Sequence, residues 1–105
     1  MKSKIGMIED HGQASDVLPA WYTGRMMTDR WLFGLYTNDG RVILIRKILA
    51  ISDDGKWMDV ELVDTETGEE YEKLLPGVIS AIANDRPRAS IQIANIVIAL
   101  DLQTS

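Results

Sequence analysis

The chain has 105 residues, of which 46% are hydrophobic and 26% are charged, and its formal net charge at pH 7 is −5. This size and composition are typical of one folded globular domain and argue against a disordered chain. With no cysteine and a single histidine, the sequence excludes disulfide bonds, thiolate nucleophiles, and zinc sites built from cysteine or from several histidines.

The acidic balance also restricts the partners. Nucleic-acid-binding proteins concentrate lysine and arginine to neutralise phosphates, whereas the basic residues here are scattered. No hydrophobic run reaches the roughly 20 residues of a membrane-spanning helix, and Glu9 and Asp10 come too early for a signal-peptide core. We therefore expect a cytoplasmic protein that binds neither nucleic acid nor membranes, with a flexible segment over residues 1–12 and a single β domain over residues 13–105.

The segment after the first dozen residues fits two structures. A helix capped by Ser15 would be interrupted by Pro19 and Gly24. A strand from Trp21 to Thr28 fits about as well. One short N-terminal helix is therefore an open alternative to an additional strand.

Three glycines, at positions 40, 55 and 68, follow polar turn residues in "YTNDGRVILI", "ISDDGKWMDV" and "DTETGEEYE". Asparagine or aspartate before glycine, between hydrophobic runs, is typical of a β-hairpin. Three such turns predict four consecutive antiparallel strands near Trp31–Thr37, Arg41–Ile51, Lys56–Asp64 and Glu69–Leu75.

The alternation of side chains supports this meander. Met58, Val60 and Leu62 share one face of the third predicted strand, and mostly polar residues take the other face. The second predicted strand is hydrophobic on both faces and is broken only by Arg46 and Lys47. Such a strand must be covered on both sides, and its charged pair indicates a bulge or a bend.

The C-terminal residues 89–102 form the most hydrophobic run. Their alternation changes phase at Ala94 and Asn95, which predicts two short strands joined by a kink. In this pattern Ile98 and Leu100 fall on the core face. Residues 74–84 fit a strand or a helical turn, and their β-branched content favours the strand. The sequence thus predicts a mainly β fold, an antiparallel meander rolled into a small barrel or sandwich.

Asp53, Asp54, Asp59 and Glu61 crowd one short run and raise the question of a metal site. Calcium loops need oxygen ligands at alternating positions, but the chain continues from Gly55 to a lysine and a tryptophan. We therefore interpret these carboxylates as turn and surface residues, and expect neither a metal nor another cofactor.

A wider acidic band contains no basic residue. Its members are Asp59, Glu61, Asp64, Glu66, Glu69, Glu70 and Glu72. This band is either a solvated face or a surface that binds a basic protein partner. It also raises a functional hypothesis, which we rank third, that the protein is an acidic inhibitor that mimics nucleic acid.

Five aromatic residues lie in the first third of the chain. They are Trp21, Tyr22, Trp31, Phe33 and Tyr36. Core packing is the simpler interpretation, and a small-molecule pocket is the second functional hypothesis. The sequence has no glycine-rich phosphate loop and no nucleophile elbow, so it argues against an enzyme and indicates no catalytic residue.

The leading hypothesis is a non-catalytic interaction or structural module that self-associates. Hydrophobic residues occupy both faces of the C-terminal strands and of the second strand, and one small domain has few elements to cover them. We expect a homodimer. Its interface is predicted to involve Ile91, Ile93, Val97 and Ala99. The alternative is that the N-terminal segment, with Ile5, Met7 and Ile8, folds back over this surface.

Overall fold

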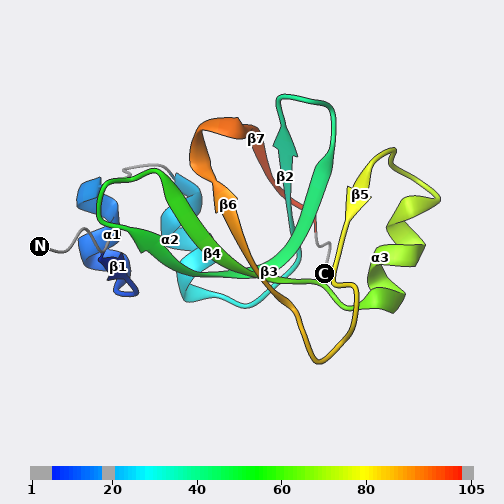
Figure 1. Cartoon of the computed structure of the whole chain (residues 1–105), viewed down its shortest axis with the longest axis horizontal. Coiled ribbons are helices and arrows are strands. Elements are labelled where there is room, and N and C mark those ends of the chain that lie inside the picture. Colours follow the sequence, from blue (N-terminus) through cyan, green and yellow to red (C-terminus); the bar gives the residue numbers. More distant parts are fainter. Residues whose placement is uncertain (1–5, 18–20, 103–105) are drawn as a thin grey trace, which may run out of the picture.

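The computed structural model describes residues 6–17 and 21–102, with the side chains of residues 21–23 left out of the description. Within these residues the protein is mixed α/β and strand-rich (Figure 1). Three short helices are α1 (His11–Val17), α2 (Trp21–Thr28) and α3 (Thr65–Glu72). The strands are β1 (Met7–Ile8), β2 (Phe33–Thr37), β3 (Val42–Ser52), β4 (Trp57–Leu62), β5 (Val78–Ile79), β6 (Arg88–Gln92) and β7 (Ile96–Asp101).

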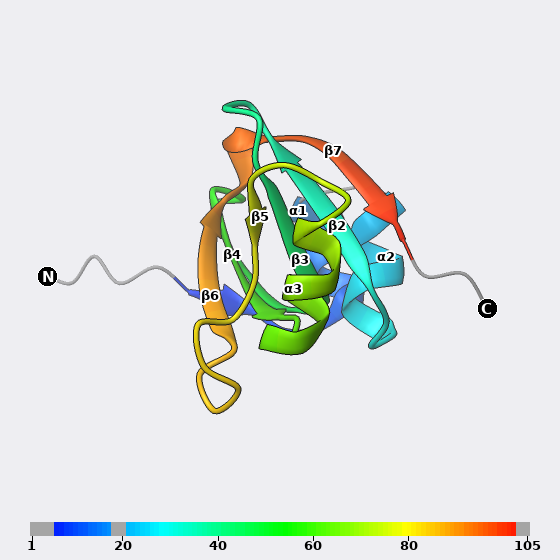
Figure 2. The ribbon, with the colours of Figure 1, turned by 90° about the vertical axis from the view of Figure 1, so that its right-hand side faces the viewer.

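All seven strands belong to one sheet whose main path is antiparallel, in the order β6-β4-β3-β2-β7. Strand β1 pairs antiparallel with the end of β3, and β5 pairs parallel with its beginning. A three-residue 3₁₀ turn, η1 (Ile93–Asn95), connects β6 to β7, which lie at opposite edges of the path. So short a link requires the sheet to roll until its edges approach each other at this end (Figure 2).

The sheet is not closed into a barrel, because no pairing joins β6 to β7 in the described part of the chain. The expected mainly β barrel or sandwich is therefore corrected to a rolled, open sheet with helices. Strand β6 pairs with β4 and strand β7 pairs with β2, so each keeps one edge without a partner strand.

The first two predicted hairpins are confirmed. Gly40 and Gly55 adopt φ values of 86° and 73° in the turns that connect β2 to β3 and β3 to β4, where a residue with a side chain would be strained. The register of β3 against β4 shifts between Ile45 and Lys47, which confirms the bulge expected at Arg46. The two C-terminal strands and the kink between them are confirmed as well.

The fourth predicted strand is wrong, because residues 65–72 form helix α3. Asp64 caps this helix by accepting a hydrogen bond from the backbone N–H of Thr67 at 3.0 Å. Gly68 is buried inside the helix rather than placed in a turn. A positive φ of 67° occurs instead at Gly77, in the turn before β5, so the strand favoured in residues 74–84 is reduced to Val78 and Ile79.

The N-terminal region is helical in α1 and α2. Ser15 lies inside α1 and donates its hydroxyl to the carbonyl of His11, so it is not the cap; Pro19 lies outside the described residues. Part of the segment expected to be flexible is ordered in β1, at the far end of β3 from β5. None of the helices in the described portion has the length and hydrophobicity needed to cross a membrane.

Two hydrophobic cores lie on opposite faces of the sheet. The main core contains Phe33, Leu35 and Ile45 together with residues of α1, α2 and β6. The second core contains Val42 and Leu44, against which Tyr71 of α3 and Leu75 pack. Strand β3 is thus covered on both faces within one chain, as its sequence demands.

Candidate functional site

The carboxylates around the second hairpin turn are engaged within the chain. Asp54 accepts hydrogen bonds from the Ser52 hydroxyl at 2.6 Å and from the Lys56 N–H at 3.0 Å, which lower its pKa. Asp59 accepts from the Ser90 hydroxyl and from Arg88, both at 2.7 Å, and its pKa is lowered for these reasons. In the ranges described, no group of three or more metal-ligating side chains is arranged to hold an ion. Asp54 therefore stabilises the turn, and Asp59 links β4 to β6.

The acidic band is divided between two environments. Asp59, Glu61 and Asp64 each pair with an arginine. The other four carboxylates lie exposed on α3 and are Glu66, Glu69, Glu70 and Glu72. A continuous acidic surface is therefore limited to one helix of eight residues.

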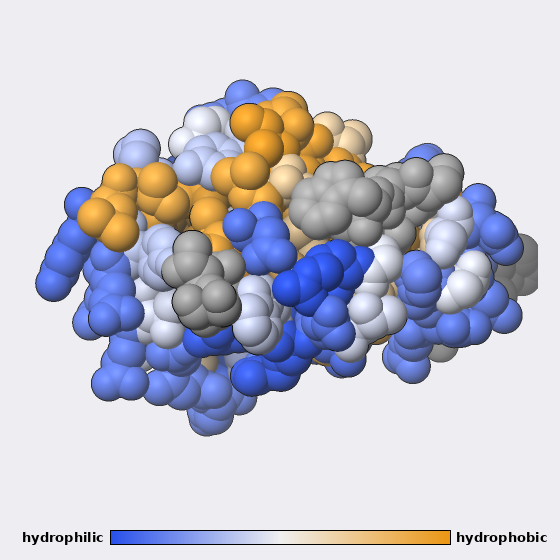
Figure 3. Space-filling view, turned by 180° about the vertical axis from the view of Figure 1, so that it is seen from behind, coloured by the Kyte–Doolittle hydropathy of each residue, from blue (hydrophilic) through white to orange (hydrophobic). Residues whose placement is uncertain are grey.

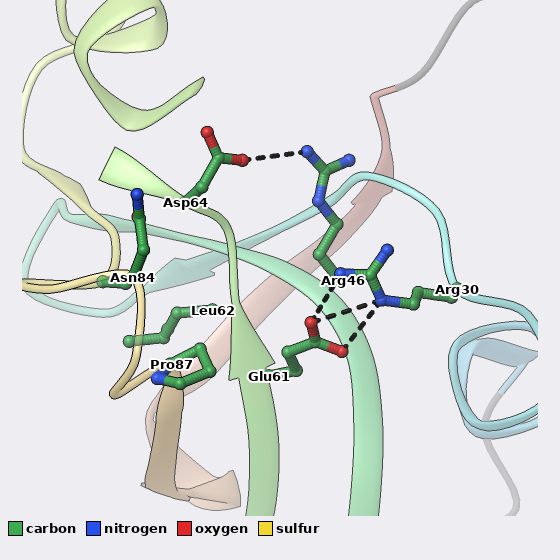
Figure 4. A pocket seen from close by; sticks show the side chains of 8 residues that line it. Arg30, Arg46, Glu61, Leu62, Asp64, Asn84 and Pro87 are labelled. Carbon is green, nitrogen blue, oxygen red and sulfur yellow. Dashed lines mark hydrogen bonds and ion pairs between the residues drawn. The ribbon is translucent and has the colours of Figure 1, made fainter. Parts of the chain in front are cut away.

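A small polar pocket of about 150 Å³ lies between α3, the end of β4 and the loop before β6 (Figure 4). The Arg30 side chain, from the loop after α2, binds Glu61 of β4 through Nε and Nη2, at 2.7 to 3.2 Å. Arg46 of β3 binds the Asp64 carboxylate at 3.2 Å and the carbonyl of Trp31 at 3.3 Å.

In each of these two ion pairs the arginine charge is balanced by a carboxylate, so the side chains that line the pocket carry no uncompensated charge. The Thr67 hydroxyl and N–H, together with Arg46, lower the pKa of Asp64 to about 2. Hydrogen bonds and the charge of Glu61 raise the pKa of Arg30. The arrangement joins β3, β4, the loop after α2 and the cap of α3, and it is a structural ion-pair network rather than an open ligand site.

The structure separates the described members of the aromatic cluster. Phe33 is buried in the main core, and Trp31 packs against that core beside the guanidinium of Arg25, which lies 5.5 Å from its ring. Tyr36 packs on the opposite face of the sheet. The side chains of Trp21 and Tyr22 lie outside the description. Trp31, Phe33 and Tyr36 line none of four hollows found among the described residues.

The residues predicted for the oligomer interface occupy different depths. Ile91 is buried in the main core, and Ile93 and Ala99 pack against it. Val97 is 60% exposed. Sequence alternation placed Ile98 and Leu100 on a covered face, but they are 49% and 37% exposed. Their exposure is not visible in the sequence, because it arises from α3 and β5 covering the beginning of β3 and leaving β7, at the edge of the sheet, uncovered.

Hydrophobic side chains gather over β7 when the molecule is seen from behind, whereas the lower part of this face is mostly hydrophilic (Figure 3). Val97 lies on the same face of the sheet as Ala99, and Ile98 and Leu100 lie on the other. From Ala89 to Leu100 the sequence contains no charged residue. The charge of Asp101, at the end of β7, is matched by Arg25 at 3.3 Å.

The backbone of β7 also presents unused hydrogen-bonding groups. The N–H of Leu102 donates to the carbonyl of Leu32 at 3.0 Å, so Ile98 and Leu100, which pair with β2 in the same register, direct their N–H and C=O groups toward β2. Ala99 and Asp101 therefore direct theirs away from the sheet, and Val97 lies at the β-bulge where the register of β7 against β2 shifts. In the part of the chain described, no strand pairs with this edge.

No family model matches this chain, and neither the curated proteins nor the solved structures contain a match to it.

Proposed function

We propose that this protein is a non-catalytic interaction module that forms a homodimer by pairing β7 with the β7 strand of a second copy. The observation that carries the proposal is the state of β7. It is an edge strand with outward N–H and C=O groups, exposed hydrophobic side chains on both faces, and none of the lysine, proline or buried charge that protects edge strands in monomers.

A twofold axis at Ile98 gives the register that best uses this edge. Val97 then lies opposite Ala99 of the partner strand, and their outward backbone groups can exchange hydrogen bonds. The two Ile98 side chains meet across the axis. The two Asp101 carboxylates fall at opposite ends of the paired strands, so their charges stay apart.

A second copy is the favoured occupant because it satisfies both partners at once. A symmetric contact between two β7 strands covers the hydrophobic edge of each chain and leaves no β7 edge to which further copies could add. An uncovered, uncharged strand is an aggregation hazard. Covering β3 does not require another chain, because α3 and β5 already lie on its outer face. The need for a partner is therefore confined to β7.

Sedimentation equilibrium at micromolar concentrations tests this proposal. We expect a species of twice the 11.8 kDa chain mass, and dissociation to monomers in Val97→Lys and Ile98→Lys. Val97 and Ile98 are 60% and 49% exposed, so each variant should still fold and unfold cooperatively as a monomer, with a melting temperature that no longer depends on protein concentration.

Leu74→Lys is the matched control. Leu74 is 75% exposed in the turn after α3, so this variant loses the same kind of exposed hydrophobic residue away from β7 and should remain dimeric. A wild-type protein that sediments as a monomer at every loading would contradict the proposal. So would equal dissociation of all three variants.

A further inference from the structure

The other free edge of the sheet, along β6, is bordered by two hollows. One, of about 370 Å³, is lined by Leu62, Ile79 and Ala89 and by the arginines at 86 and 88. The second, of about 310 Å³, is lined by Trp57, Ile91 and Gln92 and again by Ile79. Because the hollows share Ile79 and adjoin opposite halves of β6, they follow the whole five-residue strand, a length of about 17 Å.

The backbone of β6 is free along the same line. The N–H of Ile93 donates to the carbonyl of Lys56 at 2.8 Å, and the carbonyl of Pro87 accepts from Leu62. The odd-numbered residues of β6 therefore face β4. Arg88, Ser90 and Gln92 direct their backbone groups outward, and among the strands described none pairs with them.

The side chains around this edge specify what could lie on it. Ala89 and Ile91 face the main core, so residues placed opposite them would enter the two hollows. The larger hollow has a mostly hydrophobic lining, and the smaller one combines Ile43, Ile79 and Ile91 with polar side chains and Asp39. Arg88 points to the other face, and its guanidinium binds Asp59 at 2.7 Å while keeping other N–H donors available. Arg86, exposed in the loop before β6, forms no ion pair within the described residues.

An exposed isoleucine adds to the same surface. Ile82 lines the larger hollow and is 97% exposed, which leaves a large hydrophobic side chain in water beside two arginines. A chain segment lying along β6 would cover it. The described lining of this hollow contains no carboxylate, although the protein as a whole carries a net charge of −5.

We propose that β6 binds an extended segment of another protein in which hydrophobic and acidic residues alternate. The segment adds as a strand to β6, its backbone pairs with Arg88, Ser90 and Gln92, its hydrophobic side chains enter the two hollows, and its carboxylates meet Arg86 and Arg88. This site lies on the opposite edge of the sheet from β7, so it can be occupied in a dimer or in a monomer.

The test uses a capped, fluorescently labelled seven-residue peptide that alternates glutamate and valine, with glutamine and lysine versions as controls. We expect the glutamate peptide to bind about tenfold more tightly than the glutamine peptide, a difference typical of two carboxylate–arginine contacts. In the NMR spectrum, the amide signals of Arg88, Ser90 and Gln92 should shift on binding. The Ile98→Lys variant should bind the peptide as the wild type does, which separates this site from the proposed dimer.

Two charge reversals locate the interaction. Arg86→Glu should weaken the glutamate peptide about tenfold and improve binding of the lysine peptide. Lys73→Glu, the same change in an exposed residue just after α3, should alter neither affinity. Ile82→Ser should also weaken binding without changing the melting temperature, because Ile82 makes almost no contact within the chain.

Three results would overturn the inference. The first is an absence of saturable binding up to about 1 mM, a concentration at which a binding free energy of only about −4 kcal/mol would still be detected. The second is equal affinity for the glutamate and lysine peptides. The third is a set of amide shifts confined to β7.

Discussion

Gly40 and Gly68 are held by two different physical constraints. Gly40 has a φ of 86°, and no described atom lies within 4 Å of the place where its Cβ would stand. Gly68 lies in α3 without a positive φ, but an added Cβ would clash with the Ser80 hydroxyl oxygen. The first glycine is required by the backbone alone, and the second by the close approach of α3 to the residue after β5.

These constraints predict different responses to alanine. Gly40→Ala should destabilise the fold by about 1 kcal/mol through its left-handed backbone, and no neighbouring substitution should restore stability. Gly68→Ala should cost about 1–3 kcal/mol through overpacking, and Ser80→Gly in the same chain should recover most of the loss. Urea unfolding measures both effects. A neutral Gly68→Ala would show that α3 does not lie so close to Ser80.

Asp64 links a single carboxylate to the pH dependence of stability. Its pKa falls from 3.8 to about 2 in the folded protein, so the folded state binds this proton less readily than the unfolded state does. The stabilisation is complete above pH 3.8 and is lost as the pH falls toward 2.

Removing this carboxylate should therefore have a pH-dependent effect. Asp64→Ala should lower the free energy of unfolding by about 1 kcal/mol at neutral pH through loss of the α3 cap. The stability difference between the wild type and Asp64→Asn should shrink between pH 3.8 and pH 2. Thermal melts across that range check this, and a difference that does not change with pH would contradict the assigned pKa.

At the level of elements, the hairpin strands were predictable because their signals are local. Turn glycines at 40 and 55 and the alternation of Met58, Val60 and Leu62 are set within a few residues. Helix α3 was not predictable in the same way, because its only hydrophobic side chain is Tyr71 and Gly68 resembles a turn residue. The available signal was the cap, an aspartate three residues before Thr67 with Glu66 in the first turn.

The candidate surface on β7 could be predicted only in part. Sequence alternation identifies two faces of the strand, but it cannot tell which face another element covers. Ile98 and Leu100 are exposed because α3 packs against β5 and the second core rather than over β7. Of the residues predicted for the interface, Val97 is exposed and Ile91 belongs to the main core.

The two arginines of the polar pocket should contribute unequally to the joining of elements (Figure 4). Arg46 is largely buried and contacts Trp31, Asp64 and Thr67, so Arg46→Gln should cost about 1–3 kcal/mol. Arg30 is 63% exposed, and Arg30→Gln should cost less than about 1 kcal/mol. Denaturant unfolding compares them, and a larger loss for Arg30→Gln would show that the exposed pair is the main link.

At the scale of the whole molecule, the rolled sheet ends in two edges of opposite character. Strand β7 is hydrophobic and uncharged along most of its length, and β6 is bordered by arginines. A closed barrel would consume both edges, and this topology leaves both available because β6 and β7 follow each other in sequence without pairing. The sequence could not predict this opening, which depends on contacts between residues far apart in the chain.

Hydrogen exchange of the outward amides of β7 tests the central proposal most directly. If β7 pairs with a second copy, the Val97 and Ala99 amides should exchange slowly at high protein concentration and rapidly on dilution, and Ile98→Lys should make them exchange rapidly at every concentration. The amides of Ile98 and Leu100, bonded to β2, should stay protected throughout. Rapid exchange of Val97 and Ala99 at all concentrations of the wild-type protein would contradict the proposed dimer.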